Sequence, residues 1–368
     1  MSLTSTSLLV VLGLLVVAVF ALLTVGRPRL RHRWAEVGAR GGALVVLNVL
    51  VVALVGAALN DHFGFYVSWS DLAGAQAPVT VTHHGASARA AASARVGQGL
   101  HPGPAFTALP VSGQRVQHLT VTGVHSGIQG QVSILLPVGY SPTSTTRYPV
   151  IEALHGYPGT ADSWLTGMQV QSALDGRVAA RAIRPAIVVM PQINVPYGVD
   201  GECVNGPAGT PQVETWLARD VPEFVASHFR VDTTRGSWAV AGYSEGGWCA
   251  AMVGLRHPDV FSGAIVFSGA FTPEFPRAYR PFGNSLPAGY DLTRRIQHHP
   301  PPLAMWIQSS KRDGYSYPQT AAFLKVVRSP LSVTTDLLKT GGHREQLWAG
   351  ELPTALTWLG RSLPGFAP

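Results

Sequence analysis

Charged residues are scarce in this chain. Of its 368 residues only 13% are Asp, Glu, Lys or Arg, whereas 46% are hydrophobic. A chain of this length and composition is too apolar for one small soluble domain or for a disordered protein. Part of the hydrophobic excess is therefore expected to lie in lipid.

The sequence also lacks the short motifs of several common sites. It has no HExxH or CxxC spacing and its 13 His residues are scattered, so no metal site is predicted. It has no P-loop and no GxGxxG after a strand, so no nucleotide or other cofactor is predicted. Short internal repeats, which would indicate a solenoid, are absent as well.

The excess of basic residues does not indicate nucleic-acid binding. The formal net charge is +7, and a cluster of arginines stands between two hydrophobic runs near the N-terminus. Beyond residue 60 no stripe of interleaved basic and aromatic residues appears. Because a nucleic-acid interface needs such a stripe on a folded face, a nucleic-acid partner is not predicted.

The two hydrophobic runs predict two transmembrane helices. Leu8–Val25 and Gly41–Leu59 are each close to the shortest length that spans a hydrocarbon core. A cleaved signal peptide is the alternative for the first run. However, its leader Met1–Ser7 carries no Lys or Arg, and no small-residue cleavage site precedes the arginines. Residues 1–59 are therefore interpreted as an integral membrane anchor.

The loop between these runs indicates their orientation. It holds five arginines against one acidic residue, Glu36 (the arginines are Arg27, Arg29, Arg31, Arg33 and Arg40). Positive loops remain in the cytoplasm, so both flanking ends and everything after Asn60 are expected outside the cell membrane. Two cysteines, Cys203 and Cys249, suit an oxidising compartment, where they can form one disulfide; two buried free thiols are the alternative.

The rest of the chain is expected to divide into a linker and a folded domain. Residues 60–103 are rich in Ala, Ser, Gly and His with weak periodicity, which is typical of a tether, and residues 104–368 form the domain. Strand and helix patterns alternate through this domain, which predicts an α/β fold with a doubly wound, mostly parallel sheet. Val116–Val121 and Gln131–Leu136 are expected to pair as an antiparallel edge.

The expected parallel strands are Pro149–Leu154, Ala186–Met190, Trp238–Ala241, Ala264–Phe267, Leu303–Gln308 and Ser332–Leu338, and the expected helices are Asp162–Ala173, Gln212–Phe229, Gly247–Arg256, Pro318–Val327 and Gln346–Leu359.

One G-x-S-x-G pattern, Gly242-Tyr243-Ser244-Glu245-Gly246, stands between an expected strand and an expected helix. This strand-turn-helix setting is the one that a nucleophile elbow requires. The turn forces the serine into a strained backbone conformation, and small residues on either side let strand and helix approach. A glycine-rich turn with an incidental serine is the alternative. Ser244 is the predicted nucleophile.

A serine hydroxyl needs a base, and the base needs an acid to orient it. In α/β-hydrolases both follow the serine in the order acid, then His, on loops after strands. Asp313 and His343 fit this order. The rival positions fit it less well: His257 at a helix end, His298 and His299 in a Pro-rich insertion, Asp291 ahead of its strand and Asp336 inside a strand.

Two backbone N–H groups are expected to stabilise the oxyanion of the transition state. One belongs to Glu245, which follows the nucleophile, and the other to Tyr157 in the loop after Pro149–Leu154. An ordinary Gly/Pro turn is the alternative for the Tyr157 loop. His155, in the same loop, is expected to be structural.

Several segments together resemble the putative esterase family, which includes esterase D and the secreted mycolyltransferases of actinobacteria. The resemblance covers about Val116 to Leu363 and is carried by the segments Tyr148–Gly156, Val213–Leu217, Gly242–Gly247, Arg256–Phe261 and Gly342-His343. It implies an α/β-hydrolase fold with Ser244, Asp313 and His343 as the triad and Tyr157 with Glu245 as the oxyanion hole.

The chain departs from a plain esterase D in its double-span anchor and in the long loop Pro191–Pro211. We expect Cys203 in this loop to bond Cys249, one turn into the helix after Ser244, and so to shape the pocket. The mycolyltransferases have Glu where Asp313 stands here.

The sequence predicts a membrane-anchored serine esterase that hydrolyses carboxylic esters of a small molecule, lipid or acylated glycan through an acyl-enzyme. An acyltransferase acting on envelope lipids or glycans and a non-catalytic surface binding protein are the alternatives.

Overall fold

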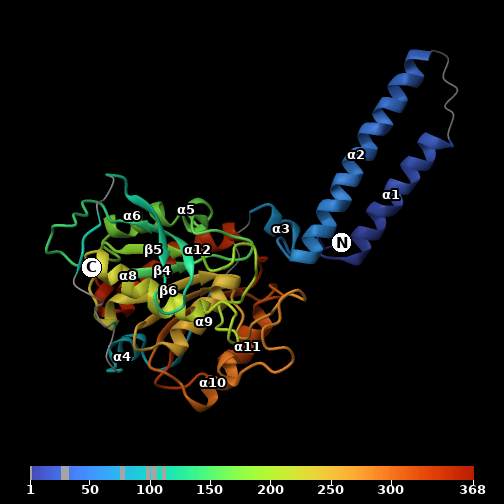
Figure 1. Cartoon of the computed structure of the whole chain (residues 1–368). Helices are drawn as coiled ribbons and strands as arrows, with labels where there is room; N and C mark the ends of the chain where they lie inside the picture. The colour runs from blue at the N-terminus through green and yellow to red at the C-terminus, as the bar shows by residue number, and fades with distance from the viewer. Residues whose placement is uncertain (1, 26–32, 75–78, 97–99, 101–105, 110–112) are drawn as a thin grey trace. The chain divides into compact units, whose positions relative to one another are not determined.

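The computed structural model describes residues 2–25, 33–74, 79–96, 100, 106–109 and 113–368. Contacts between residues divide the chain into two units (Figure 1). The first is Met1–Pro78 with Lys339–Arg344, and the second is Val79–Leu338 with Glu345–Pro368. Each unit is described by itself.

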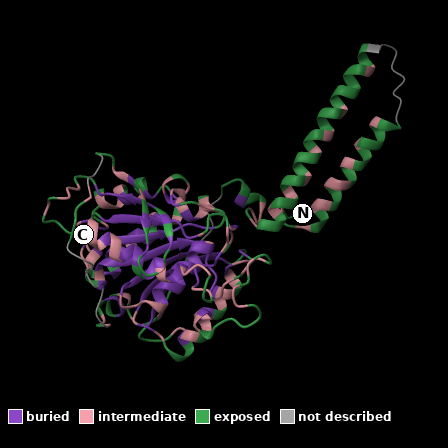
Figure 2. Cartoon of the chain, in the orientation of Figure 1, coloured by how far each residue is buried: buried purple, intermediate pink, exposed green. Residues whose placement is uncertain are grey.

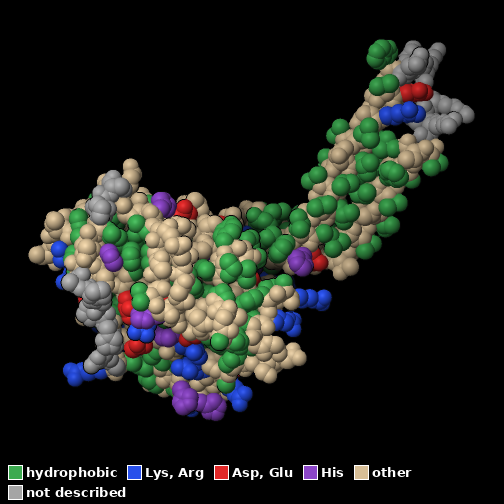
Figure 3. Space-filling view, viewed as in Figure 1, with side chains coloured by type: hydrophobic (Ala, Val, Ile, Leu, Met, Phe, Trp, Pro, Cys, Tyr) green, Lys and Arg blue, Asp and Glu red, His purple; other side chains and the backbone are tan. Residues whose placement is uncertain are grey.

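The first unit contains two long apolar helices. α1 spans Thr6–Thr24 and α2 spans Arg33–Phe63, and the two pack side by side. Their most apolar windows have mean hydropathies of 2.9 and 2.6, and no residue of these windows is buried. Hydrophobic side chains accordingly cover both helices in Figure 3. Both helices are long and apolar enough to cross a bilayer, as the two hydrophobic runs predict.

The helix bounds differ from the expected spans at both ends. α2 begins eight residues before the second apolar run, so its first turns hold Glu36 and Arg40, and it ends at Phe63. Helical hydrogen bonding thus continues into polar residues on either side of the apolar run. The loop arginines Arg27, Arg29 and Arg31 lie outside the described residues. A short helix, α3 at Trp69–Leu72, follows α2.

The second unit is built on a nine-stranded sheet with the order β1-β9-β8-β7-β6-β4-β5-β3-β2 among the described residues. The strands from β4 to β9 run parallel, whereas β2 pairs with β3, β3 with β5 and β1 with β9 in antiparallel fashion. The bounds are β1 Val79–Gly85, β2 Val116–Thr122, β3 Gln129–Leu135, β4 Val150–Leu154, β5 Ile187–Pro191, β6 Trp238–Tyr243, β7 Gly263–Phe267, β8 Ala304–Ser310 and β9 Ser332–Leu338. The predicted mostly parallel sheet and its antiparallel edge are confirmed.

Helices cover both faces of this sheet. The bounds are α4 Ala88–Ser93, α5 Ser163–Thr166, α6 Val170–Ala179, α7 Val213–Thr215, α8 Val221–His228, α9 Glu245–Arg256, α10 Leu292–His298, α11 Tyr317–Leu324 and α12 Glu345–Ser362. Val150 and Leu154 of β4 share a core cluster with α8, α9 and α11, and Ile151 and Ala153 share the opposite cluster with α6 and α12. The α/β-hydrolase architecture that the sequence predicts is therefore present, with its buried core centred on the sheet (Figure 2).

Burial on both faces of the sheet explains why the central strands can be predicted from the sequence. Every residue of β4, β5, β6 and β7 is buried. Such strands have short continuous apolar runs instead of an alternating pattern. The helix expected at Gln212–Phe229 is also present, but as α7 and α8 joined by a π-helical turn at Trp216–Asp220.

The predicted tether over residues 60–103 is wrong for the part that forms β1 and α4. β1 is an edge strand whose side chains are exposed except for the half-buried His84, so it has no hydrophobic pattern, and the main chain of β9 holds it in place. In α4, Ala91 and Ala92 are each only 2% exposed. The Arg235 guanidinium donates to the Ala92 carbonyl at 2.8 Å. Small residues here allow close packing rather than flexibility.

Because Ala92 is packed, the Ala92→Glu variant is expected to lower the free energy of unfolding by about 3 kcal/mol, since a larger, charged side chain would be forced into a core cluster that has room only for a methyl group. Ala90→Glu, at an exposed position of the same helix, is the matched control and is expected to change it by less than about 0.5 kcal/mol. Denaturant unfolding of the full chain in detergent measures both. Equal effects of the two substitutions would show that α4 is not packed.

Candidate active site

Ser244 occupies a sharp turn between the end of β6 and the start of α9. Its backbone has φ +56° and ψ −121°, a conformation that residues with a side chain rarely adopt. The Ser244 amide donates to the Phe267 carbonyl at 3.0 Å, and the Trp248 amide donates to the Ser244 carbonyl at 3.1 Å. Ser244 is half-buried in an otherwise buried run. The structure thus has the strand-turn-helix geometry of a nucleophile elbow.

Close approach of backbone explains the two flanking glycines. A Cβ atom at Gly242 would lie 1.8 Å from the Gly246 carbonyl oxygen. A Cβ atom at Gly246 would lie 2.2 Å from the Leu154 carbonyl oxygen of β4. Neither position can hold a side chain without moving main chain, which agrees with the steric demand inferred from the sequence.

The loop after β4 lies against the candidate nucleophile. A Cβ atom at Gly156 would lie 3.2 Å from the Ser244 Cβ, so the main chain that leads to Tyr157 is in contact distance of the serine. The Tyr157 side chain is 45% exposed, and its hydroxyl donates to the Gly198 carbonyl at 3.2 Å. The Glu245 amide stands at the N-terminus of α9, where backbone N–H groups are unpaired within the helix. The oxyanion hole formed by these two amides stays a prediction.

His155 has a structural place in the same loop. Its Nδ1 donates to the Gly156 carbonyl at 2.8 Å, and its Nε2 accepts from the Ile193 amide at 3.3 Å. Burial lowers the pKa of His155 to about 4, so the imidazole is neutral at pH 7.

Asp313 is held rigidly just beyond β8. It is 2% exposed, and its Oδ1 accepts from the amides of Tyr315 at 3.0 Å and Ser316 at 3.2 Å. Its Oδ2 accepts from the Ser316 hydroxyl at 2.8 Å. Because β6, β7 and β8 are parallel neighbours, Ser244 and Asp313 both follow the carboxyl ends of strands at the same edge of the sheet.

The rival residues have other partners, lie on the surface or are buried inside a strand. His257 Nε2 lies 2.8 Å from Glu214 Oε1, and Asp291 caps α10 by accepting from the Arg294 amide at 2.9 Å. His298 and His299 are exposed. Asp336 is buried inside β9, where burial, followed by the charge of Glu351, raises its pKa to about 7.

His343 lies in the segment Lys339–Arg344, which joins the first unit. This segment leaves the carboxyl end of β9 and leads into α12. The His343 amide donates to the Gly64 carbonyl at 2.9 Å, one residue beyond α2. A Cβ atom at Gly342 would lie 2.0 Å from the Phe65 carbonyl oxygen, so glycine is needed for this close approach. The convergence of His343 on Ser244 is a prediction.

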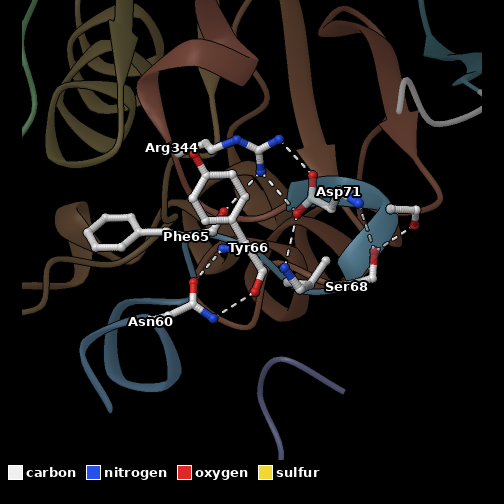
Figure 4. A network of polar contacts seen from close by, with 8 residues as sticks. Asn60, Phe65, Tyr66, Ser68, Asp71 and Arg344 are labelled. Atoms are coloured by element: carbon white, nitrogen blue, oxygen red, sulfur yellow. Dashed lines mark hydrogen bonds and ion pairs between the residues drawn. The ribbon is translucent and has the colours of Figure 1, made fainter. Parts of the chain in front are cut away.

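An ion pair fixes the residue after His343 to the segment beyond α2 (Figure 4). The Arg344 guanidinium makes a bidentate contact with Asp71, at 2.6 and 3.0 Å, and donates to the Phe65 carbonyl at 2.9 Å. It also lies over the Tyr66 ring, 4.6 Å from its centre. Asn60 pairs in turn with the Tyr66 main chain, at 2.8 and 2.9 Å. Sequence reasoning missed this arrangement, which we call the Arg344 clasp.

The predicted disulfide is confirmed. Cys203 bonds Cys249, with 5.7 Å between their Cα atoms, and so ties the loop after β5 to the first turns of α9. The Trp248 indole also donates to the Glu202 carbonyl at 2.9 Å. Both sulfurs and a Glu245 carboxylate oxygen lie within 4.8 Å of one another, but sulfurs bonded to each other do not offer the thiolates that a metal would need.

Buried acidic residues beside Ser244 are a second feature that sequence reasoning missed. Asn194 Nδ2 donates to both carboxylate oxygens of Glu245, at 2.8 and 3.0 Å. Burial, and then the like charges of Asp200 and Glu202, raise the pKa of Glu245 well above its usual range. Two features of the sequence could have indicated these buried carboxyls. They are the Glu inside the G-x-S-x-G pattern and the segment Asp200-Gly201-Glu202-Cys203.

The chain is similar in sequence to known proteins. A family model described as "Putative esterase" matches residues 127–359. An uncharacterized protein of Corynebacterium glutamicum is 28% identical over 138 residues, which are 38% of this chain and 32% of that protein. An endo-1,4-beta-xylanase/feruloyl esterase of Xylanibacter ruminicola is 26% identical over 166 residues, 43% of this chain and 22% of that protein. The chain thus spans about a third and a fifth of the lengths of these relatives.

The fold is also found among solved structures. A ferulic acid esterase superposes with a TM-score of 0.55 at 20% identity, covering 67% of this chain and 97% of the other. At this identity the likeness concerns the fold.

Proposed function

The chain belongs to the putative esterase family, and on that premise we propose that it is a serine hydrolase of carboxylic esters with Ser244 as its nucleophile. The observation that carries the proposal is the strained conformation of Ser244 at the end of β6, between glycines that no other residue could replace. A protein without catalytic use for this serine would have no reason to keep its backbone in a conformation that costs about 1–3 kcal/mol.

In the proposed reaction the Ser244 hydroxyl gives its proton to the His343 imidazole while its oxygen attacks the ester carbonyl. Asp313, fixed by its three donors, orients the imidazole and stabilises its positive charge. The amides of Tyr157 and Glu245 receive the oxyanion. The ester C–O bond then breaks, and the alcohol leaves with the proton from His343. Water adds to the acyl-enzyme with His343 as base and releases the carboxylic acid and free Ser244.

Membrane anchoring through α1 and α2 is part of the proposal. The length and hydropathy of both helices support it, and the arginine-rich loop favours a cytoplasmic position for the loop and an outer position for the hydrolase unit. The disulfide supports the same side, because such bonds persist in oxidising compartments.

Single substitutions in the three triad positions are expected to remove activity. Ser244→Ala, Asp313→Asn and His343→Gln should each lower kcat on a short p-nitrophenyl ester by about 10³-fold or more. The first substitution removes the nucleophile, the third removes its proton acceptor, and the second removes the negative charge that orients and stabilises that acceptor. Ser244→Ala should also abolish labelling by a fluorophosphonate probe.

The matched controls are the rivals Asp291→Asn and His298→Gln, which should stay within about twofold of the wild type. Wild-type protein that neither labels nor hydrolyses any ester would favour a non-catalytic binding protein. Acylated product formed on an added alcohol or glycan acceptor would favour acyl transfer over hydrolysis.

The Arg344 clasp is expected to position His343 for catalysis. Arg344→Met should lower kcat by about tenfold or more with little change in KM, because the loop that carries the general base loses its bidentate contact. Arg344→Lys should restore only part of kcat, since Lys cannot make the same fork-shaped contact. A purely structural role would instead lower the fraction of active protein, measured by fluorophosphonate titration, at unchanged kcat per labelled site.

Accessibility to a membrane-impermeant maleimide tests the topology. A cysteine at the exposed position Ser285 should react in intact cells, whereas a cysteine at His32, in the arginine-rich loop, should react only after the membrane is permeabilised. The native cysteines are bonded to each other and do not compete. The reverse labelling pattern would place the hydrolase unit in the cytoplasm.

A further inference from the structure

A groove opens between the two apolar helices of the first unit. Its volume is about 320 Å³, and all of its lining residues belong to that unit. Side chains from the N-terminal half of α1, the C-terminal half of α2 and the segment after α2 line it, among them Leu8, Leu12, Ala53, Gly56, Tyr66 and Trp69. We call it the α1–α2 groove.

The α1–α2 groove lies at the end of the helix pair away from the arginine-rich loop. That loop joins the end of α1 to the start of α2, whereas the groove is formed by the other ends of the two helices. Positive loops remain in the cytoplasm, so the proposed topology puts the groove in the outer leaflet. The one amide side chain that lines it, Asn60, is engaged by the Tyr66 main chain, and the other lining residues are hydrophobic or glycine.

Aromatic side chains gather just beyond α2. Phe63, Phe65 and Trp69 are all exposed, and Leu72 beside them is exposed as well. Trp and Tyr are enriched where the hydrocarbon core of a bilayer meets the head groups, because one part of each side chain is apolar and the other reaches water. This segment therefore marks the boundary of the outer leaflet, and the α1–α2 groove extends from it into the hydrocarbon.

The α1–α2 groove is open space and not a packed contact between helices. Small residues in membrane helices commonly let two backbones approach closely. Gly56 has no such role here, because a Cβ atom at this position would meet nothing within 4 Å. The space is also too small for a third helix, since one helical turn about 10 Å wide and about 5.4 Å long occupies on the order of 400 Å³. A single hydrocarbon chain is thin enough to enter it.

The outer end of the groove reaches the Arg344 clasp. Tyr66 lines the groove, and the Arg344 guanidinium lies over its ring, 4.6 Å from the centre (Figure 4). His343 precedes Arg344, and its amide donates to the Gly64 carbonyl at 2.9 Å. These residues all belong to the first unit. The polar end of a chain held in the groove therefore lies beside the loop that carries the proposed general base.

We infer that the α1–α2 groove binds one hydrocarbon chain of an ester lipid of the outer leaflet, so that the preferred substrates are long-chain esters that reside in the bilayer. The inference rests on the proposed esterase function and membrane anchoring, and it names the substrate class. Asp71 already pairs with the Arg344 guanidinium, so the clasp offers an anionic head group no unpaired charge. The hydrocarbon chain is then the part of the lipid that is recognised.

Two esters that differ only in chain length test the inference with the full chain in phosphatidylcholine nanodiscs. p-Nitrophenyl dodecanoate has a chain that can enter the groove, and p-nitrophenyl acetate has none. Gly56→Leu and Ala53→Leu should each lower the ratio of kcat/KM for the dodecanoate to kcat/KM for the acetate by about tenfold or more, because the added carbon atoms occupy the groove. Partitioning of the dodecanoate into the bilayer is the same for every variant and cancels in this comparison, as does the fraction of active protein.

Gly42→Leu is the matched control. It makes the same change at an exposed position of α2 near the arginine-rich loop, where a Cβ atom also meets nothing within 4 Å, and it should leave the ratio unchanged. An unchanged ratio in both groove variants would overturn the inference. So would a wild-type dimer in detergent that Gly56→Leu dissociates, measured by analytical ultracentrifugation, because a second copy would then cover the groove. Hydrolysis of neither ester, together with no fluorophosphonate labelling, would instead remove the proposed function and the inference with it.

Discussion

The reversal of the chain at Ser244 is the constraint on which the rest of the hydrolase unit depends. A serine at φ +56° can stand in the turn between β6 and α9 only if β6, α9 and the loop after β4 come into backbone contact. That contact excludes side chains at Gly242 and Gly246. The buried central strands supply the rigid frame that keeps the turn strained, since local strain persists only where the surrounding structure determines it.

The proposed site draws on segments far apart in the sequence, and each of these segments is fixed by a different kind of interaction. Main-chain and hydroxyl donors hold Asp313, and a covalent bond ties the loop of Glu202 to α9. A charged pair fixes the residue after His343 to the segment beyond α2. In the proposed reaction, this last contact gives the segment beyond α2 a part in positioning His343.

The sheet and the elbow could be predicted because their determinants are local in sequence. β4 to β7 are short apolar runs, and the elbow combines an apolar strand with two glycines at fixed spacing. β1 could not be predicted in the same way, because an exposed edge strand of Val, Thr and His has no hydrophobic pattern and depends on pairing with β9, some 250 residues away. The Arg344 clasp and the contact between Asn194 and Glu245 are likewise tertiary, because Asp71 and Arg344, or Asn194 and Glu245, become partners only after folding.

The disulfide also bears on the buried carboxyls beside Ser244. Burial, followed by neighbouring like charges, raises the pKa of Glu202 and of Glu245, so packing the loop after β5 against α9 carries a cost of desolvation. The bond between Cys203 and Cys249 joins the residue after Glu202 to the helix that Glu245 begins, and so holds this loop against α9 in spite of that cost.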